Sequence, residues 1–440
     1  MSYTFEPLPD AEAEVVDLVR DLIRIDSTNF GDDSGPGEAE VAEYIQASLR
    51  EVGIDSERFV TTGGKREGVY ARIKGKDSSR PALLAHGHID VVPAVGDWTS
   101  APFEAEIHDG MVWGRGAVDM KDGDGILLAT VRSWARNGVQ PDRDIVLLFL
   151  PDEEAGGRHG AHWLVENRPD MFEGVTEAVG EVGGFSLTVN ESLRLYFIET
   201  AEKGIRWMQL TAVGQAGHGS MLNDRNAVTA LAETVTRIGQ HQWPVRLTAT
   251  NEALVRELSQ AFNLNLDPTD VPSIVKLLGP MARLIGATFN NTAQPTMLNA
   301  GYKVNVIPGT ASAQIDGRVL PGFEAEFDQQ INDLLGEGII RTDLISDIAM
   351  ETPFDGPTVD AMAAALRAED PHARAVPYVL SGGTDAKAFA RLGIRCYGFV
   401  PLLLPPSLDF GSLFHGVDER VPVEALTFGT RVMDRFLRQA

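Results

Sequence analysis

Residues 81–93, Pro-Ala-Leu-Leu-Ala-His-Gly-His-Ile-Asp-Val-Val-Pro, decide how the rest of the chain is interpreted. The apolar run 82–85 predicts a buried strand. A polar side chain then follows at every second position: His86, His88 and Asp90. Because residues two apart in an extended chain point to the same face, two imidazoles and a carboxylate are expected together at the end of this strand. Imidazole binds zinc-type metals and commonly passes its second ring nitrogen to a carboxylate, so the stretch predicts a metal site, with a solvated loop as the alternative.

Composition limits the classes of protein to which the chain can belong. Its 440 residues exceed one modest domain, which predicts two domains. The net charge of −25 at pH 7 argues against a nucleic-acid binder, which would carry a basic patch. The single cysteine, Cys396, excludes an internal disulfide. Residues 1–14 lack the features of a signal peptide, and no apolar run approaches the ~20 residues of a membrane span. We therefore expect a cytoplasmic protein that binds neither nucleic acid nor membrane.

Strands and helices alternate through the first part of the chain. Val15, Leu18 and Leu22 follow helical spacing, whereas residues 145–150 form a fully apolar run that is typical of a buried strand. This alternation predicts an α/β fold with a mixed, largely parallel sheet and helices on both of its faces. The expected helices cover residues 12–25, 41–49 and 125–137, and the expected strands cover residues 57–61, 69–74, 82–85 and 145–150.

Acidic side chains follow several of these strands and loops. Asp119 lies among glycines, the Asp-Glu-Glu run 152–154 follows an apolar strand, and Glu181 ends another apolar run. In open α/β sheets, ligands bind outside the carboxyl ends of the strands. We therefore expect these carboxylates to converge with His88 on one site. The alternative for the Asp-Glu-Glu run is a solvated acidic loop.

The pattern changes near residue 199 and changes back near residue 355. We expect residues 1–198 and 355–440 to form one catalytic domain, with residues 199–354 inserted as a second, α+β domain. Residues 241–300 are polar and partly helical, and no place is assigned to them. The remaining helices are expected over residues 226–239, 324–335, 361–366 and 423–437. The remaining strands are expected over residues 205–213, 302–307 paired with 312–319, 377–380 and 394–400.

Six short motifs occur in a fixed order along the chain. They are His-Ile-Asp-Val-Val-Pro (88–93), Gly-Arg-Gly-Ala-Val-Asp-Met-Lys (114–121), Asp-Glu-Glu-Ala-Gly-Gly (152–157), Asn-Val-Ile-Pro (305–308), Ser-Gly-Gly-Thr-Asp (381–385) and Phe-His-Gly-Val-Asp-Glu-Arg (414–420). Each motif alone is weak, but together and in this order they are specific. In these motifs the chain resembles the M20 metallopeptidases, a family that includes carboxypeptidase G2, aminoacylase-1, acetylornithine deacetylase, succinyl-diaminopimelate desuccinylase and carboxypeptidase S.

The resemblance implies a catalytic domain of the zinc-peptidase type that binds two Zn²⁺ ions, with Co²⁺ or Mn²⁺ as possible substitutes. Asp90 is expected to orient a ligand histidine, and Glu153 to act as the general base that takes a proton from water. The peptide bond between residues 119 and 120 is expected to be cis. The implied ligands are His88 for one zinc, Glu181 for the first metal, Glu154 for the second metal, Asp119 as the bridge and His415 as the last ligand.

The inserted domain resembles the family's ferredoxin-like lid, which also forms dimers. The resemblance implies that His218 reaches the active site of a partner subunit and stabilises the oxyanion there, with help from Asn305. Arg318 is one candidate for holding a substrate carboxylate, and its alternative is a plain surface ion pair. The backbone of a glycine-rich loop is the second candidate for that carboxylate: Gly382, Gly383 and Thr384. His86 is expected either to support the ligands without binding metal or to be structural, and the following histidines are expected to be structural: His108, His159 and His162.

These features predict a di-zinc hydrolase that cleaves an amide or peptide bond next to a free carboxylate. N-acyl amino acid deacylation is the first expectation, and carboxypeptidase or dipeptidase action is the alternative. A biosynthetic deacetylase or desuccinylase, and a metal-binding protein without catalysis, are further alternatives. The expected partners are a small-molecule substrate, either an N-acyl amino acid or a short peptide, and a second copy of the chain in a homodimer.

Overall fold

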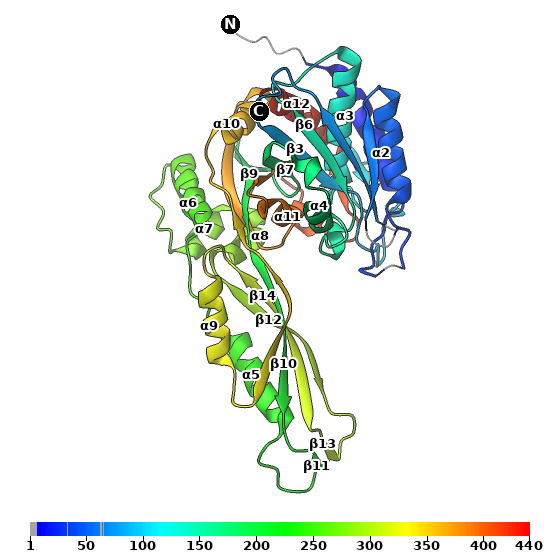
Figure 1. Ribbon diagram of the computed structural model, residues 1–440. Helices are drawn as coiled ribbons and strands as arrows, with labels where there is room; N and C mark the ends of the chain where they lie inside the picture. Colours follow the sequence, from blue (N-terminus) through cyan, green and yellow to red (C-terminus); the bar gives the residue numbers. More distant parts are fainter. Residues whose placement is uncertain (1–6, 33, 62–63, 65) are drawn as a thin grey trace.

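Two sheets organise the molecule. The structure is a computed structural model that describes residues 7–32, 34–61, 64 and 66–440. Figure 1 shows a broad body of sheet and helices, from which a narrower unit with its own sheet and helices extends. Residues 1–6, part of the segment used to predict the cellular location, lie outside the described residues. Among the helices that the structure describes, none is long and apolar enough to cross a lipid bilayer.

The main sheet has the mixed, largely parallel arrangement that the sequence predicts. Its strands are β1 (Ser56–Val60), β2 (Glu67–Ile73), β3 (Ala82–His88), β6 (Ile145–Leu150), β7 (Val175–Gly180), β8 (Ser186–Asn190), β9 (Leu193–Glu202), β16 (Met350–Glu351), β17 (Ala373–Leu380) and β18 (Arg395–Gly398). They lie in the order β1-β2-β6-β3-β7-β18-β9-β16, and β8 and β17 also pair with β9. β6, β3, β7 and β18 run parallel to one another, whereas β1, β2 and β6 form antiparallel pairs.

The strand that carries the first two histidines lies in the middle of this sheet. β3 pairs in parallel with β6 on one side and with β7 on the other. All residues of β3 and β6 are buried. A strand covered on both faces tends to be a continuous apolar run, which explains why the sequence predicts these two strands. β3 ends at His88, so both histidines lie at the end of the strand as predicted, and its alternation puts His86 and His88 on the same face as Leu84.

Helices cover both faces of the main sheet. They are α1 (Pro9–Arg24), α2 (Ala39–Glu51), α3 (Lys121–Asn137), α4 (Ala161–Asn167), α10 (Pro357–Glu369), α11 (Ala386–Ala390) and α12 (Val423–Gln439). α1, α3 and α12 pack on one another in one apolar cluster, while α4 and α11 contribute to a second cluster that includes Leu84. α3 begins before the predicted residue 125 because its first turn contains aspartate and glycine, which are weak helix formers. It ends at Gly138, whose left-handed φ of 65° fits a C-terminal glycine stop.

Short elements connect the C-terminal motif to the loop before α3. β4 (Ile107–His108), β5 (Met111–Trp113) and β19 (Arg420–Pro422) form a small sheet in which β19 pairs with β5. This pairing places residues 414–420 beside residues 114–121, although the two motifs are far apart in the sequence. The 3-10 turns cover Glu153–Ala155, Pro169–Phe172, Gly279–Met281, Ala287–Phe289 and Phe410–Ser412.

The narrower unit, named the inserted unit here, is an antiparallel sheet with helices on one face. It contains β10 (Gly204–Val213), β12 (Thr292–Ala300), β14 (Thr310–Val319), β15 (Ile339–Asp347), α5 (Ala227–Gln240) and α9 (Glu324–Leu334), and its strand order is β12-β14-β10-β15. Met208, Leu210 and Ile315 belong to the core beneath the helices. Alternate residues such as Trp207 and Gln314 point to the opposite, partly exposed face. At the far end, β11 (Gly217–His218) pairs with β13 (Val306–Ile307) to form what we name the tip (Figure 1).

The predicted pairing of strand 302–307 with strand 312–319 is wrong. β14 pairs with β10 and β12, and only the last two residues of 302–307 form a strand, which pairs with β11. Tyr302 and Val304 are 83% and 104% exposed, so their alternation does not mark a buried face. The true neighbour, β12, is difficult to predict because Pro295, which cannot donate to a strand ladder, lies at an irregularity in its pairing.

Residues 241–300, which had no predicted place, contribute to both parts of the molecule. α6 (Ala249–Phe262), α7 (Val271–Leu277) and α8 (Ala282–Gly286) precede β12. Leu254, Leu258 and Ile285 join the core of the main body, and α6 packs on β17. The predicted domain bounds stay a prediction, but the range 199–354 encloses three helices whose apolar residues join the main body.

Candidate metal centre and active site

Five predicted metal ligands come together at one edge of the main sheet. His88 ends β3, Glu154 lies in the 3-10 turn after β6, and Glu181 follows β7. Asp119 lies just before α3, and His415 belongs to the C-terminal motif. Because neighbouring parallel strands end at the same edge, ligands from distant parts of the sequence meet there.

Asp119 lies between two histidines and points one carboxylate oxygen at each. Its Oδ1 is 2.9 Å from Nε2 of His88, and its Oδ2 is 3.1 Å from Nε2 of His415. A carboxylate oxygen of Glu181 lies 3.5 Å from Nε2 of His88, and one of Glu154 lies 3.1 Å from Nε2 of His415. Each histidine therefore has its own carboxylate, and Asp119 is shared by both groups. The bond between residues 119 and 120 is cis, as the resemblance implies.

The chemistry of this cluster fits a metal centre. The ligand atoms of His88, Asp119 and Glu154 lie within 4.8 Å of one another. Oε1 of Glu154 is buried and has no hydrogen-bond partner among the described residues. Burial raises the pKa of Glu181, and hydrogen bonds to Asp119 and Glu154 raise the pKa of His415 to about 10. A set of nitrogen and oxygen donors, buried apart from His415, that stabilises positive charge in this way suits zinc-type cations.

Asp90 makes a different main contact from the one expected. Nδ1 of His88 lies 3.0 Å from the backbone oxygen of Asp90 but 3.7 Å from its carboxylate. The carboxylate instead accepts hydrogen bonds from the backbone N–H groups of Glu153 and Glu154, both at 3.1 Å. It also accepts one from the side chain of Asn29, at 2.8 Å. The backbone of Asp90 thus orients the His88 ring, and its side chain holds the turn that carries both glutamates.

The side chains of Glu153 and Glu154 point in different directions because of the turn that carries them. Asp152 adopts a left-handed φ of 71° just before it, which is uncommon for a residue other than glycine. Glu154 contacts His415, whereas a carboxylate oxygen of Glu153 lies within 4.8 Å of the ligand atoms of His88 and Glu181. Burial, followed by the negative charge of Glu181, raises the pKa of Glu153 well above its usual range. A carboxyl group with a raised pKa is suited to proton transfer near neutral pH.

Glu419 is a fully buried residue of the site that the sequence interpretation missed. Its Oε1 accepts hydrogen bonds from the backbone N–H groups of Val118, at 2.7 Å, and Asp119, at 3.1 Å. Its Oε2 accepts one from the N–H of Gly116, at 3.0 Å, and one from the guanidinium of Arg115, at 2.7 Å. Glu419 therefore fixes the loop that presents Asp119. The C-terminal motif contains this glutamate, but a motif alone does not distinguish an orienting carboxylate from a ligand.

A second buried network lies behind Asp90 and was also missed. Asn29 donates to Asp90 and accepts a hydrogen bond from Arg66 at 2.8 Å. Arg66 also pairs with Glu38 at 2.5 Å and lies 3.5 Å from the carboxylate of Asp152. The network links the loop after α1 to the turn that carries the two glutamates. The sequence gives little sign of it, because Asn29 lies in a segment that has the composition of a solvated polar loop.

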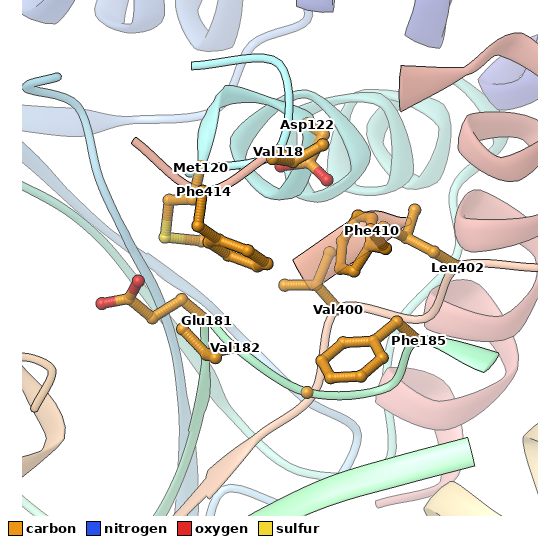
Figure 2. Close-up of a pocket in the computed structure, with 11 residues that line it drawn as sticks. Val118, Met120, Asp122, Glu181, Val182, Phe185, Val400, Leu402, Phe410 and Phe414 are labelled. Atoms are coloured by element: carbon orange, nitrogen blue, oxygen red, sulfur yellow. The ribbon is translucent and has the colours of Figure 1, made fainter. Parts of the chain in front are cut away.

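Apolar side chains enclose a small space next to the metal centre. Figure 2 shows Glu181 and Asp122 at the margin of a small space that Phe185, Phe410 and Phe414 help to enclose. The space measures about 10 Å³, which is room for about one water molecule. The carboxylate of Glu181 points away from the aromatic rings. This space is therefore too small for a substrate, and the low-dielectric aromatic side chains around it strengthen charge interactions at the centre.

His86 has the structural role that the sequence suggests. It is 2% exposed, and its ring packs edge-on against Phe389 with the centroids 4.9 Å apart. Burial lowers the pKa of His86 to about 3, so the ring is neutral at physiological pH.

The structure does not bring His218 and Asn305 to the metal centre of the same chain. Both lie at the tip, where the N–H of Gly219 donates to the backbone oxygen of Asn305 at 3.0 Å. His218 is exposed, and its Nδ1 lies 2.8 Å from the hydroxyl of Ser220. Figure 1 shows the tip at the end of the inserted unit that is farthest from the main sheet.

The candidates for holding a substrate carboxylate differ in their present contacts. Arg318 donates to Asp316 at 2.8 Å, the ion pair that was the alternative for this residue. Thr384 donates both its N–H and its hydroxyl to Glu202, at 3.0 and 2.6 Å, so it has no donor left for a ligand. In the described part of the chain, the N–H groups of Gly382 and Gly383 have no hydrogen-bond partner.

Comparison with protein families identifies this combination of fold and site. Residues 84–439 match the model of peptidase family M20/M25/M40. The chain belongs to this family. It is a metallohydrolase that acts on amide or peptide bonds, as the sequence motifs predict.

Relatives of this M20 chain are described as acting on different substrates. The "probable carboxypeptidase S-like 2" of Dictyostelium discoideum is 28% identical over 375 residues, covering 80% of this chain and 70% of the relative. The "N-fatty-acyl-amino acid synthase/hydrolase PM20D1" of Xenopus tropicalis is 27% identical over 440 residues, covering 94% of this chain and 83% of the relative. A solved M20 metallo-carboxypeptidase from Sulfolobus solfataricus superposes with a TM-score of 0.72 and 18% identity, covering 97% of this chain and 99% of that one. At such low identity this likeness supports the fold alone.

Proposed function

We propose that this M20 chain hydrolyses N-acyl amino acids at a centre of two zinc ions. The observation that carries the proposal is Asp119, which is shared between His88 and His415 while Glu153 lies beside the same cluster. The first ion would be held by His88, Asp119 and Glu181, and the second by Asp119, Glu154 and His415.

Proton transfer is the task of Glu153 in this proposal. When bound, the two cations polarise the substrate carbonyl and lower the pKa of water at the site. Glu153 takes the proton of the attacking water and passes it to the amine nitrogen as the C–N bond breaks, so that water is added across that bond. The carboxylate of Asp90 accepts the backbone N–H of Glu153 at 3.1 Å, which limits where this base can move.

Recognition of the substrate's free carboxylate is assigned to the glycine-rich loop. The unpaired N–H groups of Gly382 and Gly383 are the first candidates, because Thr384 is already engaged by Glu202. Arg318 is the second candidate and would have to exchange its contact with Asp316 for the substrate.

The proposed active form is a homodimer. The tip lies away from the metal centre of its own chain, so its two polar groups can serve catalysis only at a second copy or after a large movement. In the dimer, the partner's His218 and the partner's Asn305 supply the hydrogen bonds that stabilise the oxyanion.

Carboxypeptidase action is the second candidate function. The carboxypeptidase S-like relative favours it, whereas the relative described as an N-fatty-acyl-amino acid synthase/hydrolase favours deacylation. Both reactions cleave an amide bond next to a free carboxylate, so the same residues serve either.

Hydrolysis of a mixed panel of N-acyl amino acids and dipeptides by the zinc-loaded protein tests the proposal. We expect faster turnover of the N-acyl amino acids. Glu153→Ala should keep both metals and lose activity by about a thousandfold or more, because the base is missing. The matched control is Glu191→Ala, which removes an exposed glutamate and should leave turnover unchanged. Preference for dipeptides would favour the second candidate, and near wild-type turnover by Glu153→Ala would refute the role of this base.

A further inference from the structure

A cavity of about 500 Å³ lies between the main body and the inserted unit, beside the metal centre. Figure 1 shows α4 and α11 on the side of the main body that faces the inserted unit. A cavity of this size can hold a small organic group. The main body contributes Glu154, Ala155, His162 and Arg391, and the inserted unit contributes Ile205, Trp207 and Ile345.

The wall from the inserted unit carries three apolar side chains beside Ser346 and Asp347, and its largest side chain is held in place. Trp207 is 40% exposed and lies opposite Ile345 in the pairing of β10 with β15. Its Nε1 donates to the carboxylate of Asp316 at 2.9 Å, and the guanidinium of Arg318 lies 6.0 Å from the ring. An exposed indole that is fixed in this way offers a broad apolar surface, and little further conformational entropy is lost when a ligand packs on it.

The charged groups around the cavity balance one another. Arg391 pairs with Asp347 at 2.7 Å, while Arg158 and Glu166 add one charge of each sign. Burial lowers the pKa of His162, so this ring is neutral at neutral pH. Apart from Glu154, which belongs to the metal centre, the lining has no net charge and therefore favours an uncharged ligand group.

We infer that this cavity binds the acyl group of the substrate and that Trp207 sets the preference for a longer apolar chain. The inference rests on the proposed function. Glu154 belongs both to the cavity and to the metal centre, so a group in the cavity is adjacent to the reacting bond. The loop 382–384, the first candidate for holding the substrate carboxylate, does not line the cavity, which leaves the acyl side of the substrate for this space.

The test compares hydrolysis of N-acetyl-leucine and N-octanoyl-leucine by the zinc-loaded full chain. We expect Trp207→Ala to lower kcat/KM for the octanoyl substrate by about tenfold or more, because apolar contact is lost, and to leave the acetyl substrate nearly unchanged. Ile345→Trp, which fills the cavity from the opposite strand, should also reduce octanoyl turnover selectively. The matched control is Val213→Ala, a 57% exposed residue at the far end of β10, which should change neither value.

Each outcome of this test decides between distinct explanations. An equal loss on both substrates in Trp207→Ala, or no loss on either, would overturn the inference while leaving the proposed function standing. The inference would also be overturned if Leu222→Ala lowered octanoyl turnover and Trp207→Ala did not. The tip of a second copy would then hold the acyl chain. No turnover of either substrate by the wild-type protein would overturn the proposed function and, with it, the inference.

Discussion

The metal centre and the tip differ in how completely a single chain builds them. At the centre, Asp119 is 7% exposed and has a histidine nitrogen within about 3 Å of each of its oxygens. Further buried residues fix the loops that carry these groups, as Glu419 does for the loop before α3. At the tip, His218 is exposed, and the hydrogen-bond partner of its ring among the described residues is the nearby Ser220. One chain therefore assembles the candidate metal ligands by itself and leaves His218, the predicted oxyanion group, in solvent.

The two regions are also incomplete in different ways. The centre contains a buried carboxylate oxygen of Glu154 without a partner, which a bound cation would satisfy. The tip contains Leu222 and Val304, which are 102% and 104% exposed. Both side chains are free to contact another molecule. In the proposed function, a bound ion completes the centre and the surface of a second copy covers the tip.

Removing the group at the tip should have the largest effect of the following three changes. If the partner's His218 stabilises the oxyanion, His218→Ala should lower kcat by about a hundred- to thousandfold while metal content stays at two per chain. Steady-state kinetics combined with metal analysis measures both quantities. His372→Ala, which removes another exposed histidine, is the control and should behave like the wild type. Full activity of His218→Ala would mean that the centre works without the tip.

Weakening the hydrogen bonds that hold the loop before α3 should have an intermediate effect. Glu419→Gln replaces one acceptor oxygen with an amide that cannot accept from the backbone N–H groups before α3. Because outer groups orient metal ligands, metal affinity should fall by about ten- to a hundredfold. Competition with a chromogenic chelator measures the affinity, and Glu424→Gln, at an exposed position in the first turn of α12, is the control. Unchanged affinity would show that Asp119 is held without Glu419.

A substitution of Glu202, which lies between the two regions, should have the smallest effect, and its effect on stability should depend on pH. Glu202 ends β9, where the main sheet passes into the inserted unit, and burial raises its pKa from 4.5 to about 7. The folded protein therefore keeps a proton that the unfolded chain releases, so the free energy of unfolding falls as pH rises between these values. We expect this group to contribute a loss of about 1 kcal/mol between pH 5 and pH 6, and Glu202→Gln to remove it.

Urea unfolding of the metal-loaded proteins at the two pH values measures this contribution. Glu191→Gln, a change at an exposed glutamate, should keep the wild-type difference between pH 5 and pH 6. If Glu202→Gln kept the wild-type difference in the free energy of unfolding, the assignment of this pH dependence to Glu202 would be contradicted.

The parts of the fold that the sequence predicts well are those in which one physical signal dominates. β3 and β6 are buried on both faces, so their apolar runs predict them directly. The ends of these strands lie at one edge, which is why His88 and Glu154 could be expected to meet. The glycine stop of α3 at Gly138 is similarly local.

The parts that could not be predicted depend on contacts between distant segments. β12 contains Pro295 and few buried side chains, so only its pairing with β14 reveals it as a strand. Glu419 has its role because β19 pairs with β5, and no pattern near this glutamate shows that contact. The hydrogen bonds from Thr384 to Glu202 likewise form only because β17 lies beside β9. Such residues lack a periodic or compositional signal of their own.

The most direct measurement of the relation between the two regions is activity in mixtures of two inactive proteins. Glu153→Ala has an intact tip and a damaged centre, and His218→Ala has the reverse. After subunit exchange, proved by co-purification of differently tagged chains, we expect about a quarter of wild-type activity, since half of the dimers are mixed and each holds one intact site. No recovery despite proven exchange would contradict the claim that the tip of one copy completes the centre of another.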